Sequence, residues 1–187
     1  MPVINSNDKM PVASLMREKG VYFIAGFGDL ALVVADYIVN QWQGTPVFIG
    51  RSTLPAPSQW AAIAASARID AQAQRIRHLV ELQSKAPSLR VFQGDVSNPT
   101  QVLNALKHVH SSLGAVHGIF HTAGLLNDQL LSMKKIQQAE QVLAPKVAGV
   151  EAYEQWFDSA ASDNLDFMLL FSSISSFTGQ PGQTDYA

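Results

Sequence analysis

One stretch of the chain decides its fold: Val21-Tyr22-Phe23-Ile24-Ala25, followed by Gly26-Phe27-Gly28-Asp29-Leu30-Ala31. The first five residues are a short apolar run, which is typical of a buried strand. Apolar residues then recur at helical spacing, at Leu30, Leu32, Val33, Tyr37 and Ile38. Glycines between a strand and a helix let the backbone approach a pyrophosphate, but a pair of glycines is equally consistent with an ordinary tight turn. Asp29 also places a negative charge where a phosphate would lie.

The same alternation of strand and helix continues along the chain. Further strands are expected at 47–49, 89–92, 118–121 and 167–172, and helical regions at 58–84, 98–113 and 132–157, the last broken near Pro145. This order predicts an α/β fold, a Rossmann-like doubly wound parallel sheet of about five strands with helices on both faces. Residues 1–19 are polar and irregular and are expected to form a lead-in or linker, with one domain over residues 20–187.

The composition limits the classes of function. With 187 residues, 47% of them hydrophobic and 15% charged, the chain is long and apolar enough for one domain with a core. Its net charge of −2 gives no basic footprint for nucleic acid. The absence of cysteine excludes disulfides and thiolate metal sites, and His108 and His110 are better explained as surface residues than as a metal pair. No apolar stretch could span a bilayer and the N-terminus has no signal pattern, so a cytoplasmic protein without membrane contact is expected.

Three further strand ends carry residues suited to a nucleotide cofactor. Gly50-Arg51-Ser52 follows the second strand, where an arginine can bind a ribose 2′-phosphate and favour NADPH over NADH, or can simply be solvated. Asp95-Val96 follows the third strand; the aspartate can accept from an adenine amino group or cap the next helix. The small residues of His121-Thr122-Ala123-Gly124 either let a cofactor lie close to the backbone or form a plain turn.

A serine and a tyrosine follow the last expected strand. Ser173 closes the run that begins at Leu165, and Tyr186 comes thirteen residues later. This places a hydroxyl and a phenol at the sheet edge where open α/β sheets bind ligands, and such a pair can hold and protonate a carbonyl oxygen. Lys146 is expected at a helix start after Pro145, where a cation is unfavourable to the helix dipole, and that misfit suggests a functional role. Each residue alone has an ordinary explanation; their joint order favours a site.

With these motifs the chain resembles the ketoreductase domain of modular polyketide synthases, within the short-chain dehydrogenase/reductase superfamily. The resemblance covers about residues 20–187. The motifs that carry it are Gly50-Arg51-Ser52, Asp95-Val96, Gly118-Ile119-Phe120-His121-Thr122-Ala123-Gly124, Leu143-Ala144-Pro145-Lys146-Val147-Ala148-Gly149, Leu170-Phe171-Ser172-Ser173 and Pro181-Gly182-Gln183-Thr184-Asp185-Tyr186-Ala187. Trp60, in the long helical segment, is similar to the ketoreductases of some bacterial assembly lines.

The resemblance implies a reaction, in which NADPH reduces the β-keto group of an acyl chain carried on the phosphopantetheine of an acyl carrier protein. It implies Tyr186 as the general acid, Lys146 as the cation that favours the tyrosinate, and Ser173 as a hydrogen-bond donor to the carbonyl oxygen. Neighbouring synthase domains are implied as partners, and no metal or nucleic acid. The implied cofactor-binding residues are Gly26, Gly28, Leu30, Arg51, Ser52, Asp95, Val96, Ala123 and Gly124.

Asp128 is the implied stereocontrol residue. Leu126-Asn127-Asp128 is similar to the Leu-Asp-Asp fingerprint of ketoreductases that form a D-configured hydroxyl, and Thr178 stands where the opposite class tends to carry a tryptophan. The glycine loop departs from the family pattern by about one residue, which predicts weaker cofactor affinity.

The family's next asparagine would fall at position 190, so we expect a C-terminally truncated piece with an open fifth strand, with Tyr186 on a frayed terminus, and inactive by itself. Two alternatives remain: a non-catalytic, decayed structural module of a megasynthase, or a free-standing short-chain reductase. The position of Lys146 and the Leu-Ala-Pro-Lys run argue against the second.

Overall fold

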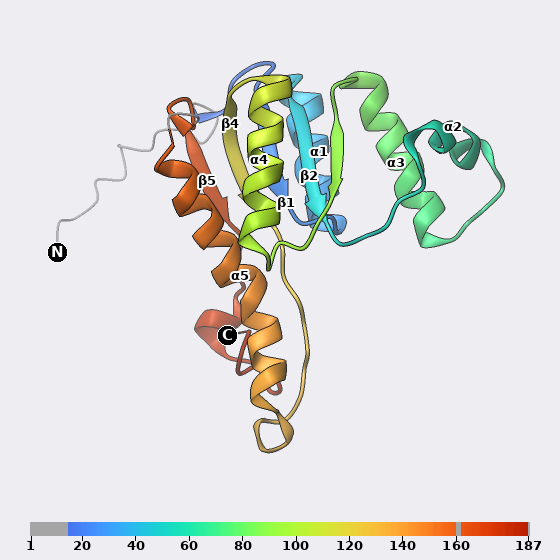
Figure 1. The fold of residues 1–187 in the computed structure, drawn as a ribbon. Coiled ribbons are helices and arrows are strands. Elements are labelled where there is room, and N and C mark those ends of the chain that lie inside the picture. Colours follow the sequence, from blue (N-terminus) through green and yellow to red (C-terminus); the bar gives the residue numbers. More distant parts are fainter. Residues whose placement is uncertain (1–14, 160–161, 187) are drawn as a thin grey trace, which may run out of the picture.

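The computed structural model describes residues 15–159 and 162–186, and these form one parallel sheet flanked by helices (Figure 1). The strand order is β3-β2-β1-β4-β5. The predicted Rossmann-like α/β class is therefore confirmed, while residues 1–14 of the expected lead-in lie outside the described residues. The strands are β1 Val21–Ala25, β2 Thr45–Gly50, β3 Arg90–Gln93, β4 Val116–His121 and β5 Phe167–Leu170.

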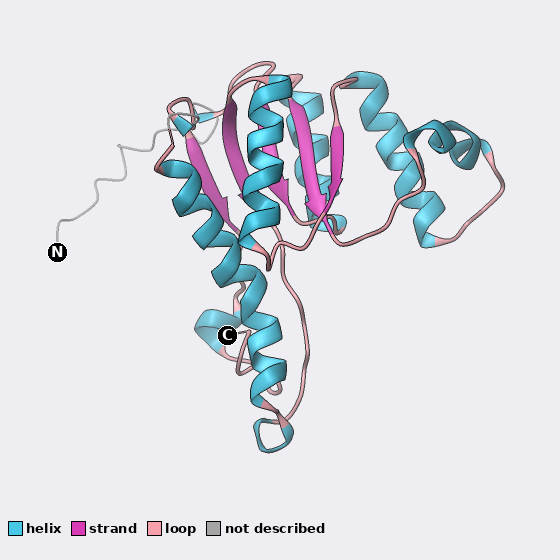
Figure 2. Cartoon of the chain, in the orientation of Figure 1, coloured by secondary structure: helices cyan, strands magenta, loops and turns pink. Residues whose placement is uncertain are grey.

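The central strand β1 is buried along its whole length because helices cover both faces of the sheet (Figure 2). Its side chains alternate between two hydrophobic clusters, as the twofold period of a strand requires. Tyr22 and Ile24 pack in one cluster with helices α1 (Asp29–Trp42) and α3 (Ala71–Lys85). Phe23 packs in the other with α4 (Pro99–Leu113) and α5 (Ile136–Phe157). The smaller helical elements are α2 Pro57–Ala65, η2 Leu131–Met133 and α6 Ser175–Thr178.

The expected helix over 58–84 is wrong in one respect, because two helices, α2 and α3, replace it. The Ser66 hydroxyl donates to the Ile63 carbonyl at 2.6 Å, and Asp70 caps α3 by accepting from the Ala73 N–H at 3.1 Å. Such local side-chain bonds satisfy helix ends and compete with a continuous helix. Ile69, predicted on the apolar face, lies between the two helices and is 84% exposed.

Helix α5 also differs from the expectation, since it continues through Pro145 without a break. A proline removes one helical hydrogen bond, and here the helix is held on both sides of it by buried residues, among them Val142, Ala152 and Trp156. Lys146 therefore lies in the middle of a helix and not at its start, so the argument from the helix dipole was wrong.

Smaller differences concern the apolar face of α1 and the ends of the strands. The buried residues of α1 include Ala31, Val34 and Ala35, whereas Val33 and Tyr37 are exposed. β5 ends at Leu170, two residues before the expected end. Within the described part of the chain, no helix is both long enough and apolar enough to cross a membrane.

Candidate functional site

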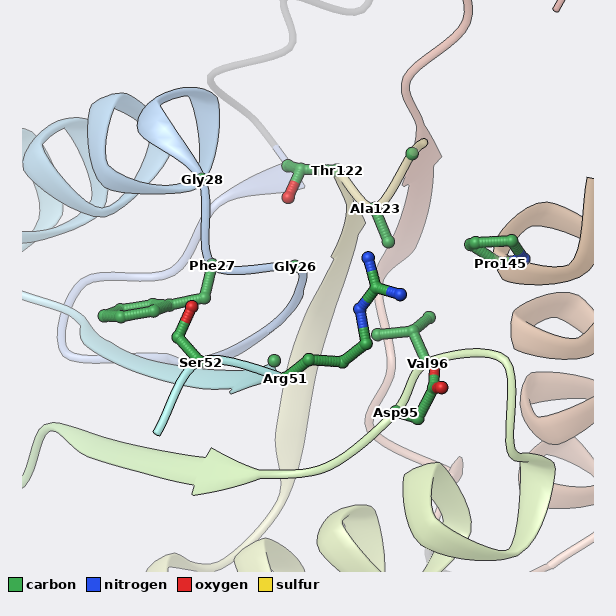
Figure 3. A pocket seen from close by; sticks show the side chains of 12 residues that line it. Gly26, Phe27, Gly28, Arg51, Ser52, Asp95, Val96, Thr122, Ala123 and Pro145 are labelled. Atoms are coloured by element: carbon green, nitrogen blue, oxygen red, sulfur yellow. The ribbon is translucent and has the colours of Figure 1, made fainter. Parts of the chain in front are cut away.

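A cavity lies at the carboxyl ends of β1, β2 and β4, beside the segment that follows β3, and it collects the predicted cofactor-binding residues (Figure 3). Leu30 is the exception: it lies on α1, is 43% exposed and does not line the cavity. The lining residues are Gly26, Phe27, Gly28, Gly50, Arg51, Ser52, Asp95, Val96, Thr122, Ala123, Gly124 and Pro145. The topology of a parallel sheet brings these strand ends to one edge, which is where such sheets bind ligands.

The glycine turn between β1 and α1 is built for close backbone approach. Gly26 has a positive φ of 121°, and a Cβ there would collide with the Thr122 side chain. Its N–H donates to the Ile49 carbonyl at 2.9 Å, which fixes the turn to β2. Gly28 precedes α1 without a side-chain cap, and nothing lies within 4 Å of its Cβ position. The first N–H groups of α1 are therefore left for an anion such as a cofactor phosphate.

An arginine lies beside the negative charge of Asp29. Its carboxylate is fully exposed and lies 3.8 Å from the Arg75 guanidinium, which also stacks over the Phe27 ring at 5.4 Å. Arg75 comes from α3, so the neighbouring helix supplies a cation beside the shortened loop. This lessens the repulsion that the sequence predicts, although an exposed pair of this kind contributes little energy.

Arg51 and Asp95 face the same cavity from the ends of β2 and β3. The Arg51 side chain extends into the cavity between the glycine turn and Val96 (Figure 3). One Asp95 oxygen accepts from the Ser97 N–H at 2.8 Å. The cap of α4 is Asn98, which accepts from the Gln101 N–H at 3.2 Å. Capping of α4 therefore does not explain why an aspartate stands at position 95.

A second cavity, of about 310 Å³, brings together the three predicted catalytic residues. Its lining comes from α5, from the end of β5 with the residues after it, and from the C-terminal turn, and consists of Val142, Leu143, Lys146, Leu170, Phe171, Ser172, Ser173, Ser176, Asp185 and Tyr186. The two cavities adjoin: Pro145 lines the first and Lys146 the second. Gly124 lines the first, and a Cβ on it would lie 3.9 Å from the Tyr186 ring and hydroxyl.

Hydrogen bonds fix two of these side chains. The Lys146 ammonium donates to the Phe171 carbonyl at 2.5 Å, and burial lowers the pKa of Lys146 below its ordinary value. The Ser173 hydroxyl donates to the Ser175 hydroxyl at 3.1 Å and accepts from the Ser175 N–H at 3.1 Å. Ser175 in turn donates to Gln183, whose amide donates to Asp128 at 2.9 Å. Asp128 lines neither cavity, but this chain of bonds links it to Ser173.

The turn that carries Tyr186 is hydrogen-bonded within itself and to the segment that follows β4, which differs from the frayed terminus expected from the sequence. The Tyr186 N–H donates to the Gln183 carbonyl at 3.1 Å, and the Gln129 N–H donates to the Gly182 carbonyl at 2.9 Å. The segment lies against the first half of α5, beyond the carboxyl edge of the sheet (Figure 1).

Sequence reasoning did not predict that His121 is buried behind the site and contacts Tyr153. This residue is 1% exposed, and its Nδ1 lies 2.9 Å from the Tyr153 hydroxyl. Burial, with the charge of Lys146 as a second cause, lowers the pKa of His121 to about 4, so the imidazole is neutral at ordinary pH. The helical period of α5, which sets Lys146, Gly149 and Tyr153 on one face, is the signal that could have found it. Across the described residues, no group of three potential ligands forms a metal site.

Comparison with known proteins gives a consistent result. A family model described as "KR domain" matches residues 20–187. Polyketide synthase PksN of Bacillus subtilis is 33% identical over 174 residues, and 6-methylsalicylic acid synthase of Aspergillus terreus is 33% identical over 175 residues. These matches cover 91% and 92% of this chain but only 3% and 10% of the relatives, so the chain spans a small part of their length.

Solved structures agree with the sequence comparison. A ketoreductase domain from the bacillaene assembly line superposes with a TM-score of 0.72 at 31% identity, over 91% of this chain and 37% of that one. An N-terminal ketoreductase from the macrolactin assembly line also gives a TM-score of 0.72, at 28% identity, over 92% of this chain and 32% of that one.

Proposed function

The chain belongs to the KR domain family of the polyketide synthases, and on that premise we propose that it reduces a β-ketoacyl thioester to the β-hydroxyacyl thioester with NADPH. The observation that carries this proposal is the single cavity lined by Lys146, Ser173 and Tyr186, next to the glycine-turn cavity. An acid, a hydrogen-bond donor and a cation around one space are what a carbonyl reduction needs from the protein.

The glycine-turn cavity fits a dinucleotide. The turn at Gly26 and the uncapped start of α1 would hold the pyrophosphate, and small residues at Ala123 and Gly124 leave room beside the backbone. Arg51 would bind the 2′-phosphate and so favour NADPH over NADH. When bound, the nicotinamide supplies a hydride to the carbonyl carbon.

Side chains of the second cavity then bind and protonate the carbonyl oxygen. The Ser173 hydroxyl donates a hydrogen bond to this oxygen as negative charge develops on it. Tyr186 transfers its phenolic proton to the same oxygen, which completes the alcohol, and the tyrosinate takes a proton back from solvent. The Lys146 ammonium, held by the Phe171 carbonyl, stabilises the tyrosinate by its charge.

The substrate and partners follow from the relatives. Because those proteins are named as polyketide synthases, we propose that the acyl chain is presented as a phosphopantetheine thioester on an acyl carrier protein within a larger synthase. The link from Ser173 to Asp128 supports a role for Asp128 in setting the orientation of the substrate, with the D-hydroxyl as the expected product.

The glycine loop supports a second candidate, a non-catalytic structural module of a synthase. Gly26 and Gly28 are the two glycines in the turn, and Asp29 adds a negative charge at the start of α1. A module of this kind would keep the fold, while its Kd for NADPH would lie far above the cellular concentration of NADPH.

The test uses the full-length protein that carries this chain, a β-ketobutyryl thioester as substrate, and two variants with opposite expected profiles. Tyr186→Phe removes the proton donor, so we expect kcat to fall by about 10² to 10⁴-fold with the Kd for NADPH unchanged. Arg51→Met removes the phosphate contact, so we expect the Kd for NADPH to rise while the Kd for NADH stays the same. A wild-type protein that neither binds NADPH nor oxidises it with the thioester would establish the structural module instead.

A further inference from the structure

One ion pair of the described residues is buried on both sides, and it lies beside the second cavity. The Lys134 ammonium contacts the Asp185 carboxylate, and the two side chains are only 4% and 6% exposed. The other pairs in the described residues are exposed on at least one side; for Arg17 and Asp166, for example, the exposures are 46% and 23%. Removing two charges from water is costly, so a buried pair is weak evidence of stabilisation; in some proteins such a pair instead fixes one arrangement of the chain.

The pair joins two segments that are distant in sequence. Lys134 follows η2, in the segment after β4, and Asp185 lies in the turn before Tyr186, 51 residues later. Two further bonds run between the same segments, from the Gln129 N–H to the Gly182 carbonyl and from the Gln183 amide to Asp128, both at 2.9 Å. We name the segments 128–134 and 182–185, with the three contacts that join them, the latch.

The latch restricts the position of Tyr186, the residue that follows it. Asp185 is bonded directly to Tyr186 in the chain, and both line the cavity that also contains Lys146 and Ser173. With the Asp185 side chain fixed, the backbone that leads into Tyr186 has little freedom to turn the phenol away. A misplacement of about 1 Å costs on the order of 10²-fold in rate, so such a constraint has catalytic value.

We propose that Lys134 and Asp185 are positioning residues, whose buried ion pair holds the turn at 182–185 so that Tyr186 faces Ser173 and Lys146. The catalytic part of this inference rests on the proposed function; the latch itself is a statement about structure and is measured without substrate. The same contact makes the segment that carries Asp128 and the turn that carries Tyr186 move as one unit.

The experiment uses the full-length protein and three variants. Lys134→Met removes the charge and keeps the length of the side chain, Lys134→Arg keeps the charge, and Lys135→Met changes the exposed neighbouring lysine as a matched control. Hydrogen exchange followed by mass spectrometry, without substrate, should show faster exchange over residues 180–186 in Lys134→Met only. With the β-ketobutyryl thioester, kcat should fall by about 10- to 100-fold in the same variant.

The Kd for NADPH distinguishes a misplaced Tyr186 from a general loss of structure. The proposed NADPH cavity is lined by residues that follow β1, β2, β3 and β4, and not by the latch. We expect it to stay within two-fold in Lys134→Met, and Lys134→Arg to recover most of kcat. Unchanged exchange over 180–186, or a fall in kcat matched by Lys135→Met, would overturn the inference. If Lys134→Met does not fold, the isosteric Asp185→Asn carries the same test. A wild-type protein without reductase activity would refute the proposed function, while the exchange result would still decide the latch.

Discussion

At the scale of single residues, the neutral histidine behind the site is the feature with the clearest chemical consequence. His121 ends β4, and its ring is enclosed by Tyr153 and Gly149 of α5. A charged imidazole would lose its hydration there and would face the ammonium of Lys146. The structure therefore keeps His121 uncharged, and a proton is taken up more readily by the unfolded chain than by the folded one.

This difference predicts a loss of stability in acid. The pKa of His121 is about 4 in the folded protein against an ordinary value of 6.5, so the free energy of unfolding should fall as the pH drops from 6.5 towards 4. Burial also lowers the pKa of His117, which acts in the same direction. The site-specific measurement is an NMR titration, in which the ring protons of His121 should stay unshifted down to about pH 5. A His121 titration near pH 6.5 would contradict the burial argument.

At the scale of an element, α5 combines two tasks on one helix. Ala152 and Trp156 are buried in the cluster that includes Phe23 and Ile119 and attach the helix to the sheet, while Lys146 reaches the second cavity. At Gly149 the helix approaches β4 closely, because a Cβ there would lie 2.6 Å from the His121 ring. A small residue at this point lets the helix carry Lys146 close to the end of the strand.

Gly149→Ala tests this close approach. Alanine favours a helix by about 1 kcal/mol over glycine, but overpacking a buried contact costs about 1–3 kcal/mol, so we expect a net loss of up to about 2 kcal/mol. Urea unfolding monitored by circular dichroism measures it. Val147→Ala, at a position 55% exposed on the same helix, should change stability by less than about 0.5 kcal/mol. A stabilising Gly149→Ala would show that the ring has room to move.

At the scale of the whole molecule, the sheet is open and ends in an apolar edge strand, β5. β1 lies at its centre, and β5 is an edge strand with no paired strand on its outer side among the described residues. β5 is short and wholly apolar, Phe167–Leu170, and Leu170 is 47% exposed. Unpaired apolar edge strands favour pairing with another chain.

We therefore predict that the 187-residue chain, expressed alone, self-associates through β5. Sedimentation velocity should show species larger than a monomer that increase with concentration. Leu170→Lys places a charge on this edge and should restore the monomer. Leu126→Lys changes another exposed leucine outside any strand, and an equal effect of both variants would indicate general apolar contact instead of edge pairing.

The sequence by itself determined the alternation of strands with helical regions and the edge of the sheet at which the site forms. The apolar run of β1, the glycines after it and the small residues after β4 are local patterns, and a parallel sheet necessarily brings such strand ends together. That is why the predicted cofactor residues, Leu30 apart, line one cavity, and why Ser173, which follows β5, lies at the same edge of the sheet.

Only the tertiary structure decided how these residues are held. The break between α2 and α3, the unbroken path of α5 through Pro145 and the exposure of Leu30 depend on packing that no local period contains. The bond between His121 and Tyr153 spans 32 residues and the pair of Lys134 with Asp185 spans 51. Propensity and periodicity act over a few residues, whereas such contacts are set by where whole elements lie against one another.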